Sequence, residues 1–341
     1  MTGLDPRALD AWLFEHVPGF RDLRSIEKLG GGQSNPTYKL VAASGSYALR
    51  TQPPGELLPS AHAVDREFKV MSALAVTAVP VPRMLALADD PAASPIGRKM
   101  FVMELLGGRT FDDPALPDLQ PEQRTAVFDR MNETLAALHG IEPGEVGLAS
   151  YGRGEGYFAR QLAIWQRQYA ASLTEPIEEM DRLSEWLDGN LPPDGRAVSI
   201  VHGDWRLDNL MFARTGPEVI AVLDWELSTL GDPMADLAYQ VMAWRLPQDG
   251  LFHGLAGLDR AALGLPTDDE YIDAYCARRR IERPDWFEAA VAHAAFRFAA
   301  ILQGVFKRSL QGNASDPQRA RRLGRAVPSV ARVGLDAAGI A

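Results

Sequence analysis

The feature that most constrains this chain is a set of three polar side chains, each placed beside a short apolar run. Asp204 follows the run at residues 199–201, and Asn209 comes five residues later. Asp224 directly follows a further apolar run at residues 219–223. Short buried strands in this order turn the chain back on itself, so we predict that the three side chains converge on one cleft.

The stretch between these residues indicates how they meet. Residues 209–212 read as a short strand, and Thr215-Gly216-Pro217 is typical of a turn that returns the chain. A hairpin of this kind would bring Asp224 beside Asn209. Two carboxylates and an amide oxygen are the groups that phosphoryl transfer needs, one to orient a hydroxyl and two to hold Mg²⁺. Taken singly, each acidic residue is more simply a turn cap, and His202 is more simply a histidine of the core. Together, in this order, the residues favour a functional site.

The pattern His-Gly-Asp-x-x-x-x-Asn at 202–209, with Asp224 after the next strand, resembles the aminoglycoside phosphotransferase and choline kinase superfamily. The resemblance implies an α+β, protein-kinase-like bilobal fold with a strand-rich small lobe and a mostly helical large lobe. It also implies ATP and Mg²⁺ as cofactors, Asp204 as the catalytic base, and Asn209 and Asp224 as metal ligands. His202 would support the catalytic loop. Glu226 either adds a contact near the metal or is a solvated surface residue.

A glycine-rich segment in the first part of the chain is a candidate for holding phosphate. The backbone of Gly31 and Gly32 can approach phosphate oxygens closely, and Ser34 and Asn35 can add side-chain donors. The segment is not a Walker A loop, because no Gly-Lys-Ser/Thr follows it. A plain hairpin turn is the simpler reading of the glycines, but the alternating residues 37–41 that follow favour a phosphate-binding hairpin.

The kinase-like resemblance assigns further nucleotide contacts to this part of the chain. Arg50 would contact the α- and β-phosphates and pair with Glu67, which lies in an apolar helical pattern at residues 64–74. Surface arginine and glutamate are common, so this pairing depends on the order of the elements. Backbone groups of the hinge from Glu104 to Leu106 would meet the adenine.

The length of 341 residues exceeds what one simple core requires and fits two lobes. We assign residues 1–24 to a helical lead-in, 25–106 to a small nucleotide-binding lobe, and 107–341 to a helical catalytic and substrate lobe. Apolar spacing predicts a long helix over residues 123–139. Asp232-Pro233 predicts the start of another helix, and Asp236 in its first turn either holds the backbone of the catalytic loop, as in kinase-like folds, or favours the helix dipole.

Composition excludes some classes of function. A net charge of −10 argues against a nucleic-acid partner. The single cysteine, Cys276, cannot form a disulfide within the chain, which fits a reducing cytoplasm. The first residues lack a signal-peptide pattern, and no stretch reaches ~18 uninterrupted apolar residues, so we expect no membrane span. The arginine-rich stretch at residues 319–325 is interpreted as a solvated helix.

Several segments are similar to a subgroup, the kinase-like domain that is fused to, or encoded beside, certain acyl-CoA dehydrogenases. The similarity runs from about residue 25 to about residue 312. It implies phosphorylation of a hydroxyl on an acyl-CoA and a functional link to such a dehydrogenase. One departure is Thr51-Gln52, where a basic pair often follows the arginine. The segments that carry the resemblance are residues 29–38, 49–55, 202–209, 223–233 and 301–305.

Charge separates the possible acceptors. An aminoglycoside is polycationic and needs carboxylates, whereas a CoA ester is polyanionic and needs cations such as Arg160, Arg167, Lys307 and Arg308. The overall acidity favours the first, although net charge says little about one pocket. Three hypotheses follow: a small-molecule O-kinase acting on a hydroxyacyl-CoA or related metabolite, an antibiotic kinase, and a catalytically weak nucleotide-binding partner of an acyl-CoA dehydrogenase. The intact catalytic set at positions 204, 209 and 224 argues against the third.

Overall fold

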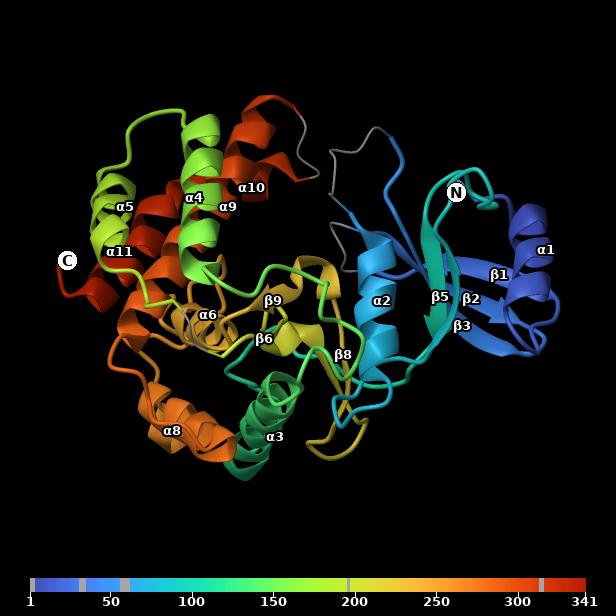
Figure 1. The fold of residues 1–341 in the computed structure, drawn as a ribbon, viewed down its shortest axis with the longest axis horizontal. Helices are drawn as coiled ribbons and strands as arrows, with labels where there is room; N and C mark the ends of the chain where they lie inside the picture. Colours follow the sequence, from blue (N-terminus) through green and yellow to red (C-terminus); the bar gives the residue numbers. More distant parts are fainter. Residues whose placement is uncertain (1–3, 31–34, 56–61, 195–196, 313–315) are drawn as a thin grey trace.

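A computed structural model describes residues 4–30, 35–55, 62–194, 197–312 and 316–341. The first third of the chain forms a strand-rich lobe, and the remainder forms a larger, mostly helical lobe (Figure 1). The predicted α+β, protein-kinase-like bilobal fold is therefore confirmed.

The small lobe is built on one antiparallel sheet with the strand order β1-β2-β3-β5-β4. Alternating burial along β2 produces one face that packs on a helix, as expected for a half-buried strand. Helix α1 packs on this face, and its start is capped by Asp5, whose carboxylate accepts from the Arg7 amide. The elements are α1 (Pro6–His16), β1 (Leu23–Lys28), β2 (Thr37–Ala42), β3 (Gly45–Thr51), α2 (Val64–Leu74), β4 (Met84–Ala88) and β5 (Met100–Glu104).

The hydrophobic cores divide differently from the predicted lobes. Leu9 and Leu13 of α1 belong to a core confined to the small lobe. Met71 and Leu74 of α2 are instead buried in the cluster that continues through the large lobe. Arg66 of α2 also donates to the Tyr151 carbonyl oxygen at 2.9 Å. Helix α2 is therefore fixed to the large lobe.

The large lobe is organised around one long helix, α9, which packs against α4, α6 and α11. The helix predicted over residues 123–139 is confirmed as α3. The helices are α3 (Pro121–His139), α4 (Tyr157–Ser172), α5 (Glu178–Gly189), α6 (Met234–Trp244), α7 (Arg260–Leu263), α8 (Asp268–Arg279), α9 (Phe287–Leu310), α10 (Pro317–Arg325) and α11 (Val327–Ala338).

Helix α9 is long and apolar enough, by length and composition, to cross a membrane, and among the described residues it is the one helix of which this holds. In the structure 67% of its most apolar stretch is buried inside the protein. Its side chains contact α4, α6 and α11, so within this fold it serves as a core helix.

Four short strands carry the predicted catalytic segment. The strand expected at residues 199–201 and the hairpin expected between Asn209 and Asp224 are both present, with β6 paired to β9 and β7 paired to β8. The Leu223 amide donates to the Asn209 carbonyl oxygen at 2.8 Å, which places Asp224 next to Asn209. These elements are β6 (Ser199–Val201), η1 (Leu207–Asn209), β7 (Leu210–Phe212), β8 (Val219–Val222), η2 (Trp225–Leu227) and β9 (Thr229–Gly231).

Candidate active site

The loop after β6 is held by a buried carboxylate on α6. Asp236 accepts from the backbone amides of His202 at 2.7 Å and of Gly203 at 2.8 Å. Burial opposes ionisation of Asp236, but its hydrogen bond to His139, the neighbouring imidazole of His202 and the Gly203 amide lower its pKa below the usual value. Of the two roles considered for Asp236, the structure shows the first, a contact that fixes the loop.

Gly203 is required by the path of this loop. Its φ of +82° lies in the left-handed region, and a Cβ there would come within 2.6 Å of the Leu227 carbonyl oxygen. The close approach joins the Asp204 loop to η2, which directly follows Asp224. The two carboxylate-bearing segments are thereby fixed side by side.

His202 supports both segments from inside the core. Its Nδ1 accepts from the Asp204 amide at 3.2 Å, and its Nε2 lies 2.9 Å from the Leu223 carbonyl oxygen. Since a carbonyl only accepts, these partners assign the proton to Nε2. The ring is fully buried between Trp205 and Trp225. The expected supporting role of His202 agrees with this geometry.

Asp204 is positioned as an ionised acceptor. Asn209 donates through Nδ2 to its carboxylate at 2.9 Å and to its carbonyl oxygen at 2.8 Å. Arg206 forms an ion pair with it at 3.2 Å between Nε and Oδ1. Burial would raise the pKa of Asp204, but the charge of Arg206 and the Asn209 hydrogen bond lower it below the usual value. At neutral pH the carboxylate can therefore accept from, and orient, a hydroxyl group.

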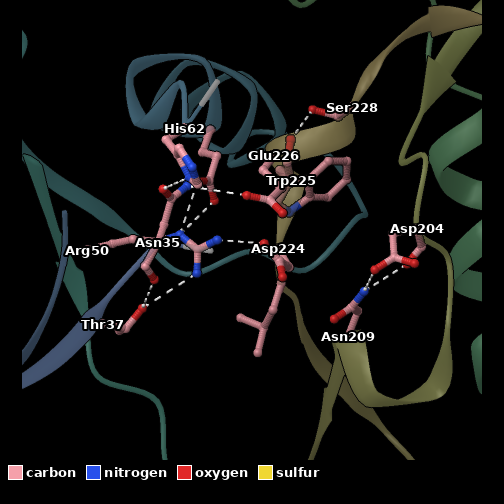
Figure 2. Close-up of polar contacts among 12 residues, drawn as sticks. Asn35, Thr37, Arg50, His62, Asp204, Asn209, Asp224, Trp225, Glu226 and Ser228 are labelled. Atoms are coloured by element: carbon pink, nitrogen blue, oxygen red, sulfur yellow. Dashed lines mark hydrogen bonds and ion pairs between the residues drawn. The ribbon is translucent and has the colours of Figure 1, made fainter. Parts of the chain in front are cut away.

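Asn209 and Asp224 offer a donor set that fits Mg²⁺. With Nδ2 of Asn209 directed at Asp204, its Oδ1 is left as an acceptor, and Asp224 adds a carboxylate from the neighbouring segment (Figure 2). One or two hard oxygen ligands from the protein are typical for Mg²⁺, which completes its coordination with water and substrate phosphate oxygens. Asp224 has a φ of +62°, an uncommon backbone conformation that recurs at functional sites. No cluster of three or more acidic, histidine or cysteine side chains suited to a metal occurs among the described residues.

The small lobe contributes an ion-pair network to the candidate site. Arg50 of β3 contacts Glu67 of α2 at 2.9 Å, as the sequence predicts. Its Nη2 also contacts Asp224 of the large lobe at 2.5 Å, which the sequence did not indicate (Figure 2). Burial raises the pKa of Glu67 to about 7, although Arg50 and Asn35 act in the other direction.

Asn35 contacts the carboxylates of this network. Its side chain is buried, and Nδ2 donates to Glu67 at 2.7 Å and approaches Glu226 at 3.5 Å. Its Oδ1 lies 3.1 Å from Nδ1 of His62. The predicted donation of this side chain to phosphate stays a prediction, and it would require the amide to leave these carboxylates. Glu226, considered either solvated or near the metal, also joins this network.

The structure describes only some of the remaining residues that were predicted to contact the nucleotide. Gly31, Gly32 and Ser34 lie outside the described residues. The Glu104 amide donates to the Arg83 carbonyl oxygen at 3.0 Å, so this N–H is not available to adenine. Within the described ranges, no residue forms a hydrogen bond with the backbone of Leu106, which leaves both of its groups open to a base.

Sequence reasoning missed two arginines. Arg206 lies two residues after Asp204, and a cation so close to the predicted catalytic carboxylate is a signal that the sequence contains. Arg297 of α9 donates from Nη2 to the Gly203 carbonyl oxygen at 2.6 Å and is buried beside the rings of Trp165 and Tyr239. No local signal marks Arg297, because its contact with the loop arises only from the packing of α9.

Comparison with known proteins agrees with this geometry. The family model described as "Phosphotransferase enzyme family" matches residues 25–291. Acyl-CoA dehydrogenase family member 10 of Mus musculus is 45% identical over 306 residues, which is 89% of this chain and 28% of the relative. The chain thus spans less than a third of the length of that relative.

Solved structures show the same fold. A Ralstonia eutropha protein, described as a candidate aminoglycoside phosphotransferase, is 44% identical, with a TM-score of 0.88 and 98% coverage of both chains. The spectinomycin phosphotransferase in complex with ADP and spectinomycin is 12% identical, with a TM-score of 0.63, and covers 98% of this chain and 99% of its own. The second likeness concerns the fold alone.

Proposed function

Because the chain belongs to the phosphotransferase enzyme family, we propose that it transfers the γ-phosphoryl group of ATP to a hydroxyl of a small molecule, specifically a hydroxyacyl-CoA or a related metabolite. The observation that carries the kinase assignment is the ionised Asp204, hydrogen-bonded to Asn209 on a loop that Asp236 fixes. Phosphoryl transfer depends mainly on such positioning and on charge neutralisation.

Asp204 accepts a hydrogen bond from the acceptor hydroxyl and directs its oxygen at the γ-phosphorus. The new P–O bond forms to this oxygen as the bond to the β-phosphate oxygen breaks, and ADP leaves with that electron pair. The hydroxyl proton passes to Asp204 and then to solvent. Arg206, paired with Asp204, adds positive charge beside the reacting oxygens.

On the donor side, Arg50 would contact the α- and β-phosphates, and Leu106 would offer backbone groups to the adenine. Mg²⁺, held by Asn209 and Asp224, would supply charge neutralisation of the phosphates when bound. Since Arg50 now pairs with Asp224, nucleotide binding has to replace this contact by contacts to phosphate. The spectinomycin phosphotransferase of the same fold binds ADP, which supports ATP as the donor.

The proposed acceptor rests on the kind of protein in which related domains occur. The matching segment of the mouse relative belongs to a protein named as an acyl-CoA dehydrogenase family member. A kinase that is joined to, or works with, such an enzyme would act on the same class of thioester. Its location would then be the cytoplasm, where ATP is available.

An ADP-release assay on the purified protein tests this proposal. The acceptors are hydroxyacyl-CoAs, aminoglycosides, macrolides and amino alcohols, each also offered to Asp204→Asn as the matched control. ADP release with a hydroxyacyl-CoA that disappears in the control, together with a phosphorylated product in mass spectrometry, supports the proposal. Release only with an aminoglycoside would establish the antibiotic kinase instead, and release equal to the control with every acceptor would contradict the kinase assignment.

A further inference from the structure

A strongly basic segment lies at the end of α9 and along α10. Residues 307–325 contain six lysines and arginines and a single aspartate, in a chain whose net charge is −10. Four of these cations, Arg319, Arg321, Arg322 and Arg325, are exposed on α10, and we call them the α10 arginines. Among the described residues none of them forms an ion pair.

Two of the α10 arginines line a cavity, which a merely solvated helix would not require. The cavity has a volume of about 350 Å³ and is formed by the start of α10 and the loop after α6. Its walls include Arg319, Arg322, Leu251 and His253. This volume lies at the small end of the range that small-molecule sites occupy.

The acidic groups at this cavity are committed to local contacts. Asp316, which lines it, accepts from the Arg319 amide at 2.9 Å at the start of α10. Asp249 accepts from the amides of Leu251 and Phe252 at 2.9 and 3.0 Å. The charged groups that line the cavity are thus two arginines and one carboxylate, and this carboxylate already caps α10. The excess of positive charge favours an anionic ligand.

Aromatic side chains connect this cavity to the catalytic loop. Phe252, next to His253, contacts Phe298 of α9 with ring centroids 6.0 Å apart. Phe298 in turn contacts Tyr239 of α6 at 6.3 Å. Arg297, which donates to the Gly203 carbonyl oxygen, lies with its guanidinium carbon 5.4 Å from the centroid of the Tyr239 ring, so this ring lies beside the catalytic loop. A chain of ring contacts therefore runs through the core from the catalytic loop towards the basic cavity.

We propose that this cavity binds the phosphate groups at the nucleotide end of a CoA thioester whose acyl hydroxyl lies at Asp204. The inference rests on the proposed function and adds to it the place where the anionic end is recognised. Guanidinium groups bind phosphate oxygens in pairs, which suits Arg319 and Arg322. An extended pantetheine arm spans roughly 15 Å, since about a dozen bonds each advance ~1.25 Å. This length is compatible with the two successive ring contacts, Phe252–Phe298 and Phe298–Tyr239, that separate the cavity from the catalytic loop.

Figure 1 agrees with this placement, since α10 lies on the side of the large lobe that is nearer to the small lobe. Gly324 of α10 is pressed against Phe306 of α9, nine residues along the helix from Arg297. At about 1.5 Å per residue, α10 stands roughly 13 Å along α9 from the level of the catalytic loop. This separation also matches the reach of the pantetheine arm.

The test is a titration with coenzyme A, with Mg²⁺ and AMP-PNP present to occupy the nucleotide cleft, because CoA itself carries an adenine nucleotide. The double variant Arg319→Gln/Arg322→Gln removes the two cavity arginines. Its matched control, Arg321→Gln/Arg325→Gln, removes the same charge from the same helix outside the cavity. We expect CoA affinity to weaken about 10- to 100-fold in the first variant and less than about 3-fold in the control.

A kinetic comparison localises the effect to the phosphates. The KM of a hydroxyacyl-CoA should rise in Arg319→Gln/Arg322→Gln by a similar factor, whereas the KM of the corresponding hydroxyacyl-pantetheine, which lacks the phosphates, should stay unchanged. Equal weakening of CoA binding by both double variants, or by neither, would overturn the inference. So would an absence of CoA binding to the unmodified protein.

The two proposals can fail separately. If a hydroxyacyl-CoA is phosphorylated but neither double variant changes CoA affinity, the proposed function stands and the cavity assignment is wrong. If CoA binds through Arg319 and Arg322 but no hydroxyacyl-CoA is phosphorylated, the cavity is a CoA site and the proposed function is wrong.

Discussion

The two sides of the proposed active site are built in different ways. On the acceptor side, Asp204 lies on a loop whose amides are fixed by Asp236 and whose carboxylate is held by Asn209. On the donor side, Arg50 spans the cleft, and pairs at once with Glu67 and Asp224. In the proposed mechanism the acceptor side keeps these contacts, whereas the donor side exchanges partners when nucleotide binds.

This difference separates the expected effects of mutation. A group that only orients the attacking oxygen should affect turnover and leave nucleotide affinity intact. A group in the donor-side network should affect nucleotide affinity first. The predictions below are designed to break this division, beginning with the largest effect.

The largest effect is expected for Asp204→Asn, which preserves shape and removes the negative charge. Turnover should fall about 10³- to 10⁴-fold, because the hydroxyl loses the acceptor that orients it and takes its proton. Steady-state ADP release with the identified acceptor measures this. A loss below about 10-fold in a folded variant would remove Asp204 from the catalytic role.

Arg50→Ala should act mainly on nucleotide binding. We expect the KM for ATP to rise about 10- to 100-fold, because a phosphate contact is lost and the buried Glu67 loses its cationic partner. Arg50→Lys is the control, since it retains the charge but lacks the separate guanidinium nitrogens that contact Glu67 and Asp224. The rise in the KM for ATP should be intermediate in this variant. A fall in turnover at saturating ATP, with an unchanged KM, would contradict the assignment.

Asp236→Asn tests whether the acceptor loop is positioned from α6. An amide has one acceptor oxygen, so it cannot serve the His202 and Gly203 amides with two oxygens as the carboxylate does. We expect turnover to fall about 10-fold and the free energy of unfolding to fall by about 1–3 kcal/mol, with little change in the KM for ATP.

Asp232→Asn is the control for a simple helix-end effect. Asp232 accepts from the Met234 amide at 2.8 Å at the start of the same helix. Its substitution should alter turnover less than that of Asp236. Comparable losses of turnover in the two variants would assign the Asp236 effect to the helix end and not to the loop.

The smallest effect concerns the pH dependence of stability. Because burial raises the pKa of Glu67 to about 7, the folded protein keeps a proton that the unfolded chain releases above about pH 4.3. The stability contributed by this group is therefore present at low pH and is lost as the pH rises through about 7, by on the order of 1–3 kcal/mol.

Thermal unfolding between about pH 4.5 and 8 measures this dependence, with the slope compared between the unmodified protein and Glu67→Gln. The variant should lose the decline in Tm that the glutamate causes. Glu27→Gln, at an exposed position on β1, is the control and should keep it. Identical slopes in the unmodified protein and Glu67→Gln would show that Arg50 keeps this carboxylate ionised throughout the range.

The acceptor side was largely predictable from the sequence because its determinants are local. The spacing of Asp204, Asn209 and Asp224 fixes a loop and a hairpin within about twenty residues, and the structure has both. The long helix at 123–139 and the strand at 199–201 were predicted for the same reason, since each depends on the periodicity of its own residues.

The donor side was less predictable because its contacts join distant segments. The Arg50–Asp224 pair joins two lobes, and the buried amide of Asn35 depends on where α2 packs. The hydrogen bond from Arg297 to Gly203 likewise depends on the path of α9. Residue type and local spacing say nothing about contacts that only the packing of the lobes creates.

The most direct test of the division between the two sides is a calorimetric titration of Mg²⁺-AMP-PNP into Asp204→Asn and Asp224→Ala, side by side with the unmodified protein. We predict that Asp204→Asn binds within about 3-fold of the unmodified protein, whereas Asp224→Ala loses about 100-fold or more of its magnesium-dependent affinity. Equal losses in the two variants would contradict the account.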